Sequence, residues 1–146
     1  MGSVTRQLHK HRLIALDTCV WIYHFEQHPR FGKTAGDVLD AVANGHCRAA
    51  ISELTLMELL TGPLKLDRQD VADEYELLLS HYPNLSLVPV TRNVLLDAAQ
   101  IRASHGFNTP DAIILATARQ SGASLVVTND RRWGNFPGVK VLFLGE

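Results

Sequence analysis

Short apolar runs alternate along this chain with longer segments whose apolar residues recur every three or four positions. The short runs cover residues 13–16, 48–51, 85–88, 124–127 and 139–143. Those at 13–16 and 124–127 lack the apolar–polar alternation of a half-exposed strand, which is typical of strands covered on both faces. The longer segments predict helices at residues 18–28, 31–44, 52–63, 70–82, 91–103 and 109–122.

The order of these elements predicts the fold class. Strands separated by helices favour parallel pairing, so the sequence predicts an α/β fold. The last helix is expected to start with Thr109 as N-cap and Pro110 at its first position, and the third to end near Gly62-Pro63. In the helix at 91–103, the residues expected to face the core are Val94, Leu95, Ala98 and Ile101.

Length and composition are those of an ordinary globular protein. The 146 residues, 46% of them hydrophobic, predict a single domain over 1–146 with one core. Residues 1–11 are basic and lack hydrophobic periodicity, so they are expected to form a flexible N-terminal extension. With 14 Lys plus Arg against 15 Asp plus Glu, the chain does not bind nucleic acid through bulk charge, and any such contact must be local.

Cysteine use and hydropathy indicate the compartment. The longest apolar stretches are far short of a membrane span. Cys19 and Cys47 lie far apart without a metal-type spacing, and no apolar signal sequence opens the chain. A cytoplasmic protein without membrane contact is therefore expected.

Acidic residues stand where strands end and where helices begin. Asp17 closes the run LIALD and Asp130 closes LVVTND, while Asp111 falls in the first turn of the helix that leads into the second run. Ligands of open parallel sheets bind outside the carboxyl ends of the strands. A short loop between helix and strand places the helix start beside that same end, so these three carboxylates should meet.

A fourth acid is harder to place from the pattern. Glu58 lies six residues into its helix, which places it roughly 9 Å from the edge of the sheet at ~1.5 Å per residue. Geometry alone therefore favours Glu53 as the fourth acid.

Each acid also has a structural explanation, as a helix cap, a turn residue or an exposed helix position. Taken together, however, carboxylates crowded at one edge repel one another unless a cation neutralises them. An all-oxygen set suits Mg²⁺ or Mn²⁺, and two such ions about 3.5–4 Å apart can clamp both oxygens of a phosphodiester displacement. A metal-dependent nuclease is the leading prediction.

Motifs for competing chemistries are mostly absent. The chain has no GxxxxGK[ST] loop, no GxGxxG after its first strand and no HExxH helix. Cys19 stands where phosphatases of the haloacid dehalogenase type carry a second aspartate. Receiver domains usually place an acidic pair after the first strand, where this chain has only Leu16-Asp17.

Two arginines and a tryptophan follow the last acid. Arg131 and Arg132 are candidate RNA-binding residues, with a solvated loop as the alternative. Trp133 is expected to pack in the core rather than to stack on a base.

The motifs LDT, ELLTG, PDAIILATA and TND-RRW, in this order, resemble the PIN-domain family, and within it the VapC-type toxins of bacterial toxin–antitoxin pairs. The resemblance spans about residues 13–144. It selects Glu58 over Glu53, and it assigns the catalytic and metal-binding acids as Asp17, Glu58, Asp111 and Asp130, with Thr128 and Asn129 as supporting residues. It implies a three-layer α/β/α fold with about five parallel strands, Mg²⁺- or Mn²⁺-dependent endoribonuclease activity, a homodimer and inhibition by a cognate antitoxin.

Three alternatives stay open at this point. The first is a PIN-domain nuclease of RNA processing, and the second is a catalytically silent PIN-like binding module whose acids only cap helices. A receiver-type phosphoacceptor is a more distant third.

Overall fold

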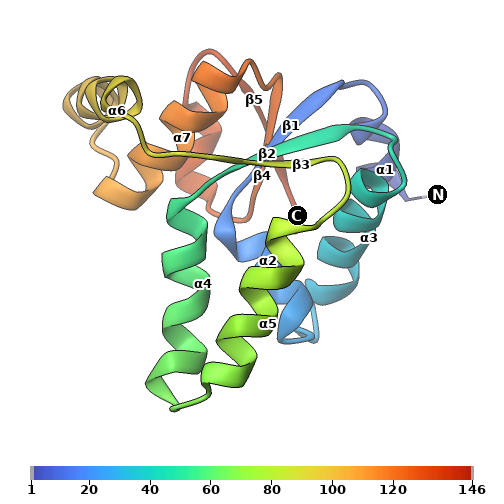
Figure 1. Cartoon of the computed structure of the whole chain (residues 1–146). Coiled ribbons are helices and arrows are strands. Elements are labelled where there is room, and N and C mark those ends of the chain that lie inside the picture. Colours follow the sequence, from blue (N-terminus) through green and yellow to red (C-terminus); the bar gives the residue numbers. More distant parts are fainter. Residues whose placement is uncertain (1, 146) are drawn as a thin grey trace.

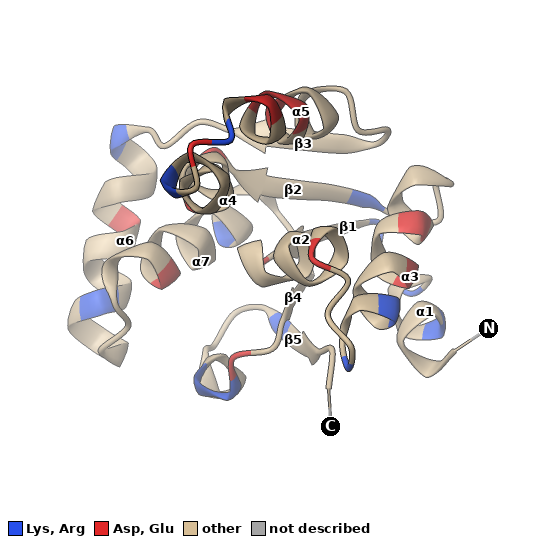
Figure 2. Ribbon diagram, turned by 90° about the horizontal axis from the view of Figure 1, so that it is seen from below, with Lys and Arg blue, Asp and Glu red and all other residues tan. Residues whose placement is uncertain are grey.

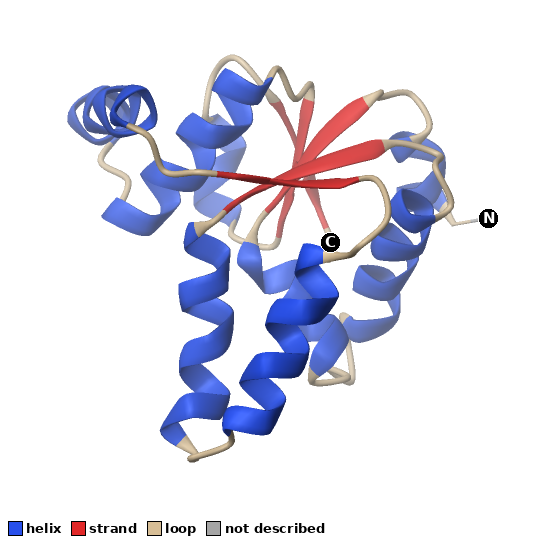
Figure 3. Ribbon diagram, viewed as in Figure 1, coloured by secondary structure: helices blue, strands red, loops and turns tan. Residues whose placement is uncertain are grey.

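A five-stranded parallel sheet forms the centre of the computed structural model, which describes residues 2–145. Its strands are β1 (Leu13–Leu16), β2 (Arg48–Ser52), β3 (Leu85–Val88), β4 (Leu125–Thr128) and β5 (Lys140–Phe143). They lie in the order β3-β2-β1-β4-β5, and every neighbouring pair is parallel (Figures 1 and 3). The prediction of an α/β fold with about five parallel strands is therefore confirmed.

Helices cover both faces of this sheet and complete the three layers. They are α1 (Ser3–Leu8), α2 (Thr18–Phe25), α3 (Gly32–Ala43), α4 (Leu54–Lys65), α5 (Gln69–Ser80), α6 (Arg92–His105) and α7 (Thr109–Ser121), with a 3-10 turn η1 at Arg131–Asn135. The first core cluster joins α1, α2, α3 and α5 to the sheet, and the second joins α6, α7 and η1 to its other face. Ile14 and Leu16 of β1 belong to the first cluster and Ala15 to the second, which explains why this strand is apolar throughout.

The first helix is one that the sequence pattern does not predict. Ser3–Leu8 is helical, and Leu8 is fully buried against the core beside α3. The expectation of a flexible extension over residues 1–11 does not hold for this stretch; residue 1 lies outside the described residues. One anchoring leucine on a six-residue helix is too short a signal for periodicity to detect.

Two helix ends differ from the prediction. Asn108, not Thr109, is the N-cap of α7, and its side chain accepts a hydrogen bond from Asp111 N at 2.9 Å. Asn ranks above Thr as a cap, which accounts for the shift by one residue. Helix α4 continues through Pro63 to Lys65, so this proline lies inside the last turn and does not end the helix.

The inward face of α6 is narrower than predicted. Val94, Ala98 and Ile101 are buried, whereas Leu95 is 48% exposed and Leu96 62%. Helix α6 packs chiefly on α7, so only one row of its residues reaches the core. Over residues 2–145, no helix has both the length and the apolarity needed to cross a bilayer.

Candidate active site

The carboxyl ends of β1 and β4 bring two of the four acids together. Asp17 follows β1 directly and caps α2, its Oδ1 accepting a hydrogen bond from Thr18 N at 2.7 Å. Asp130 follows β4 after one residue and caps η1. Because β1 and β4 are parallel neighbours, both acids lie at the same edge of the sheet.

Thr128, the last residue of β4, links these two acids. Its hydroxyl donates to Asp17 Oδ2 at 2.8 Å and accepts from Asp130 N at 3.0 Å. Thr128 is fully buried, so this hydroxyl is held in one position. A network of this kind fixes the direction of the Asp17 carboxylate before any ligand arrives.

Glu58 reaches the same edge through contacts between α2 and α4. Thr18 Oγ1 donates to Glu58 Oε1 at 2.7 Å and lies 2.9 Å from Thr55 Oγ1. A hydroxyl has one proton, so Thr55, which is fully buried, donates to Thr18 in turn. Helical side chains lean toward the N-terminus of their helix, which offsets the descent of Glu58 along α4. Glu53 is exposed at the start of α4 and forms no side-chain hydrogen bond among the described residues.

Asp111 lies beside Asp130, and Arg132 contacts both. The Arg132 guanidinium donates to Asp130 through Nε at 3.0 Å and through Nη2 at 2.6 Å, and Nη2 lies 3.7 Å from Asp111 Oδ2. The arginine side chain is 71% exposed, so the pair lies at the mouth of the site. The structure thus brings the four acids into two linked pairs, Asp17 with Glu58 and Asp111 with Asp130.

The electrostatics of these pairs differ. Burial raises the pKa of Asp17 to about 6, and the charges of Asp111 and Glu58 add to this effect against the hydrogen bond from Thr128. Burial also raises the pKa of Asp111. Arg132 instead holds the pKa of Asp130 below its usual range, through its hydrogen bonds and its charge. Arg132 therefore pairs with Asp130 and lies 3.7 Å from Asp111, whereas no such ion pair with Asp17 is found among residues 2–145.

This donor set fits a divalent ion of the hard type. Carboxylate and hydroxyl oxygens surround Asp17, and an ion there would relieve the repulsion that raises its pKa. Within residues 2–145, no three Asp, Glu, His or Cys side chains are grouped closely enough to ligate one ion directly. Mg²⁺ usually binds through one or two carboxylates and keeps several waters.

The residues after Asp130 have structural contacts of their own. Trp133 is fully buried in the core beneath Asp111, which agrees with the predicted packing role. Its indole N–H forms no regular hydrogen bond but lies close enough to Asp111 to lower the pKa of that carboxyl. Asn129 Oδ1 accepts from Gly145 N at 3.0 Å, and the Arg131 guanidinium lies 4.4 Å from the Phe143 ring centre and donates to Gly145 O.

Sequence reasoning missed three residues that position the acids. Thr18 and Thr55 orient Glu58, and Asn108 fixes the start of the helix that carries Asp111. The threonine that follows the first aspartate in LDT was the available signal for Thr18. Thr55 had no signal, because its role depends on how α4 packs against α2.

A family model and several solved structures match this fold. A family model described as PIN domain matches residues 14–139. Among solved structures, a toxin–antitoxin complex from Klebsiella pneumoniae is 24% identical, with a TM-score of 0.71, and covers 91% of this chain and 98% of its own. VapBC from Salmonella typhimurium bound to DNA is 25% identical, with a TM-score of 0.71, and covers 90% of this chain and 97% of its own. VapBC2 from Rickettsia felis is 20% identical with the same TM-score and covers 90% and 98%. The comparison with curated proteins found no match.

Proposed function

The chain belongs to the PIN domain family, and from this premise we propose that it is a Mg²⁺- or Mn²⁺-dependent endoribonuclease that acts as the toxin of a type II toxin–antitoxin pair. The family is one of nucleases, and divalent metal is its general requirement. Solved relatives of similar fold are toxins in complex with their antitoxins.

The observation that carries the proposal is the Asp17 carboxylate, buried and pre-oriented among three other acids. Asp17 would hold the central ion, Glu58 and Asp111 would complete its surroundings, partly through water, and Asp130 would hold a second ion or orient the attacking water. Bound metal supplies charge neutralisation for the phosphodiester and activation of water. Thr128, Thr18 and Thr55 keep the acids in place.

RNA is the substrate that best fits a site at the exposed edge of the sheet. The site lies at the surface of the sheet edge, where a single-stranded or looped phosphodiester can enter without opening a duplex. Arg132, largely exposed, is placed to exchange its carboxylate partners for a substrate phosphate. Arg131 is a second candidate, although it is engaged with Phe143 and Gly145 in the free protein.

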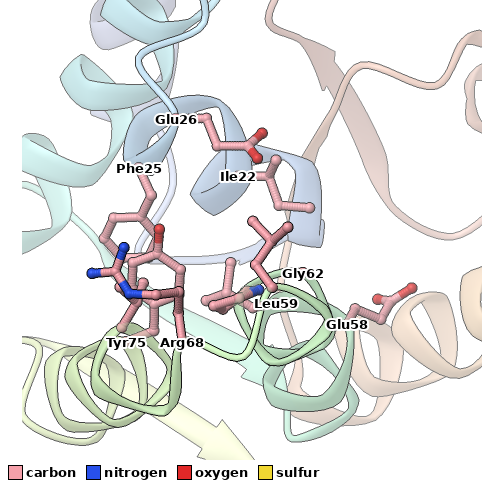
Figure 4. A pocket seen from close by; sticks show the side chains of 11 residues that line it. Ile22, Phe25, Glu26, Glu58, Leu59, Gly62, Arg68 and Tyr75 are labelled. Carbon is pink, nitrogen blue, oxygen red and sulfur yellow. The ribbon is translucent and has the colours of Figure 1, made fainter.

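A groove beside Glu58 is our candidate for the antitoxin-binding site. It lies between α2, α4 and α5, has a volume of about 280 Å³ and is lined mainly by apolar side chains, among them Ile22, Phe25, Leu59 and Tyr75 (Figure 4). Because Glu58 lies at its border, a peptide segment bound in the groove would also block access to the acids.

The rim of the groove adds charge to this apolar floor. Glu26 and Arg68 flank it, and Leu66 beside them is 76% exposed. An antitoxin segment with apolar side chains and charges of both signs fits these features. Leu66→Glu should weaken complex formation with the product of the neighbouring gene, whereas Leu96→Glu on α6 should not.

We infer that the protein acts in the cytoplasm. Cys19 and Cys47 are both free thiols, as expected in a reducing compartment, and RNA is available there.

The deciding experiment is cleavage of a structured RNA mixture by purified protein with Mn²⁺, with Mg²⁺ and with EDTA. Asp17→Asn and Glu58→Gln should abolish cutting, while Glu53→Gln, on the same helix, should cut like the unmodified protein. Equal cutting by Asp17→Asn would reject the proposal. Absence of both cutting and Mn²⁺ binding would instead favour the silent binding module.

A further inference from the structure

The edge of the sheet opposite the acids carries a cluster of basic residues. Arg12 precedes β1, Arg48 opens β2 and Lys140 opens β5. Hydrogen bonds tie these starts together, since Arg48 N donates to Arg12 O at 2.8 Å and Lys140 N to Ser124 O at 3.3 Å. The amino ends of the parallel strands all meet at this edge, where β1 and β4 lie between β2 and β5. Lys140 is in register with Leu125 and Ile14, whereas Arg48 pairs with Leu13, so Arg48 and Lys140 lie on opposite faces of the sheet.

The segment before β1 adds to this cluster. His11 Nδ1 lies 2.7 Å from Ser124 Oγ, which holds the segment against the start of β4. Burial lowers the pKa of His11, and the charges of Lys140 and Lys10 lower it further. The two lysines therefore act on the same small region from different parts of the chain.

These cations have few opposite charges around them. Across residues 2–145, Lys10, Arg12, Arg48 and Lys140 take part in no ion pair. On α3, which lies beside α1 (Figure 2), Asp37 already pairs with Lys33. For a chain of net charge −1, such a concentration of exposed cations is a local exception that a polyanion would relieve.

A groove lies beside β5, and neither the basic residues named above nor the four acids are among the residues that line it. It runs between α1 and β5, has a volume of about 570 Å³, and is lined by Gln7 of α1, Thr34 of α3 and the outer side of β5, with Arg131 at its far end. Arg131 follows Asp130 directly. β5 is the last strand of the sheet, so an extended chain can pass along it without crossing another strand.

We propose that Lys10, His11, Arg12 and Lys140 bind the phosphate backbone of the RNA away from the cleaved bond. The inference rests on the proposed ribonuclease function and extends it. The matched family model begins at residue 14, so Lys10, His11 and Arg12 precede the matched range. Four residues of β5 span roughly 13 Å, so only an RNA longer than a few nucleotides reaches the second surface.

The test compares RNA affinities of two doubly substituted proteins with that of the unmodified protein. Lys10→Gln/Lys140→Gln removes two charges from the cluster, and Lys65→Gln/Arg92→Gln removes two exposed charges from α4 and α6. Binding of a labelled single-stranded RNA of roughly 20 nucleotides, longer than the ~4–16 nucleotides of a compact site, is measured by anisotropy in EDTA at several salt concentrations.

We expect the Lys10/Lys140 variant to bind the long RNA several-fold more weakly, with a salt slope reduced by about 1.4, which corresponds to two lost phosphate contacts. The control pair should bind like the unmodified protein. Cleavage of an RNA of about four nucleotides in Mn²⁺ should be the same in all three proteins. Unchanged affinity and slope in the Lys10/Lys140 variant would overturn the inference.

Two further measurements distinguish a failure of this inference from a failure of the ribonuclease proposal. If no protein cleaves either RNA in Mn²⁺, the ribonuclease proposal fails, while the binding comparison in EDTA still decides whether the cluster holds a phosphate backbone. With single-stranded DNA of equal length, an equal loss supports backbone recognition. A loss with DNA alone would contradict the assignment to RNA.

Discussion

At the scale of single residues, the function of Asp17 opposes the stability of the fold. Its carboxylate is partly buried and forms no ion pair within residues 2–145, and desolvation raises its pKa from 3.8 to about 6. A raised carboxyl pKa means that the folded state binds the proton more tightly than the unfolded chain does. The folded state is therefore favoured as pH falls through about 6 and loses this advantage as pH rises.

Asp17→Asn should consequently stabilise the metal-free protein. At pH 7 we expect the free energy of unfolding to rise by up to about 3 kcal/mol, because the uncompensated charge is removed. The difference between the two proteins should shrink by roughly 1 kcal/mol at pH 5, where Asp17 takes up a proton in the folded state. Urea unfolding in EDTA at both pH values measures this. A less stable Asn variant at pH 7 would show that the carboxylate is needed for the fold itself.

The indole N–H of Trp133 is the second feature at this scale. Phenylalanine in its place would fill the same core without a donor toward Asp111. Trp133→Phe should weaken Mn²⁺ binding a few-fold and leave the fold intact, since one donor beside a ligand carboxylate is lost. Trp21→Phe is the matched control, because Trp21 is equally buried and its N–H is also unpartnered. Equal effects of both changes on Mn²⁺ affinity would assign Trp133 to packing alone.

At the scale of elements, helix starts determine where the acids lie. Asn108 caps α7 through Asp111 N at 2.9 Å, and Thr91 caps α6 through Val94 N at 3.3 Å. Asn108→Ala and Thr91→Ala should each cost about 1 kcal/mol of stability. Only Asn108→Ala should also lower the cleavage rate, because only that cap positions a site residue. Thermal unfolding and RNA cleavage, measured on both variants, separate the effect on stability from the effect on the site. Equally reduced cleavage in Thr91→Ala would argue against a positioning role for Asn108.

The elements also show how far sequence reasoning reaches. The strands and the convergence of Asp17, Asp111 and Asp130 follow from local patterns and from the geometry of parallel sheets. The choice of Glu58 over Glu53 does not, because it depends on the packing of α4 against α2 and on the hydroxyl of Thr18. The sequence pattern does not predict helix α1 for a similar reason. Its one buried residue, Leu8, is recognised as a core residue only once its packing beside α3 is known.

At the scale of the whole molecule, two neighbouring leucines are exposed on α6. Leu95 and Leu96 of α6 lie away from the groove beside Glu58 and from the acids. We expect a homodimer through this helix, in line with the common two-fold symmetry of oligomers. Light scattering should give a dimer for the unmodified protein and a monomer for Leu95→Glu/Leu96→Glu. A dimer that survives both changes would place the interface elsewhere.

The whole molecule separates its charges as well. The acids lie at the carboxyl edge of the sheet and the basic cluster at the amino edge, so the near-neutral net charge hides two surfaces of opposite character. Bulk composition therefore excluded only a uniformly basic protein. It did not exclude local contacts with nucleic acid, because such contacts depend on where the cations are placed.

The central claim is that the four acids form a divalent metal site. Its most direct test is a Mn²⁺ titration of the metal-free protein, with free Mn²⁺ followed by electron paramagnetic resonance, beside Asp17→Asn, Asp111→Asn and Glu53→Gln. We predict that the unmodified protein and Glu53→Gln bind Mn²⁺ alike and that the two aspartate variants lose at least about tenfold in affinity, which corresponds to the effect of removing a ligand. Mn²⁺ binding of unchanged affinity in Asp17→Asn would contradict the claim.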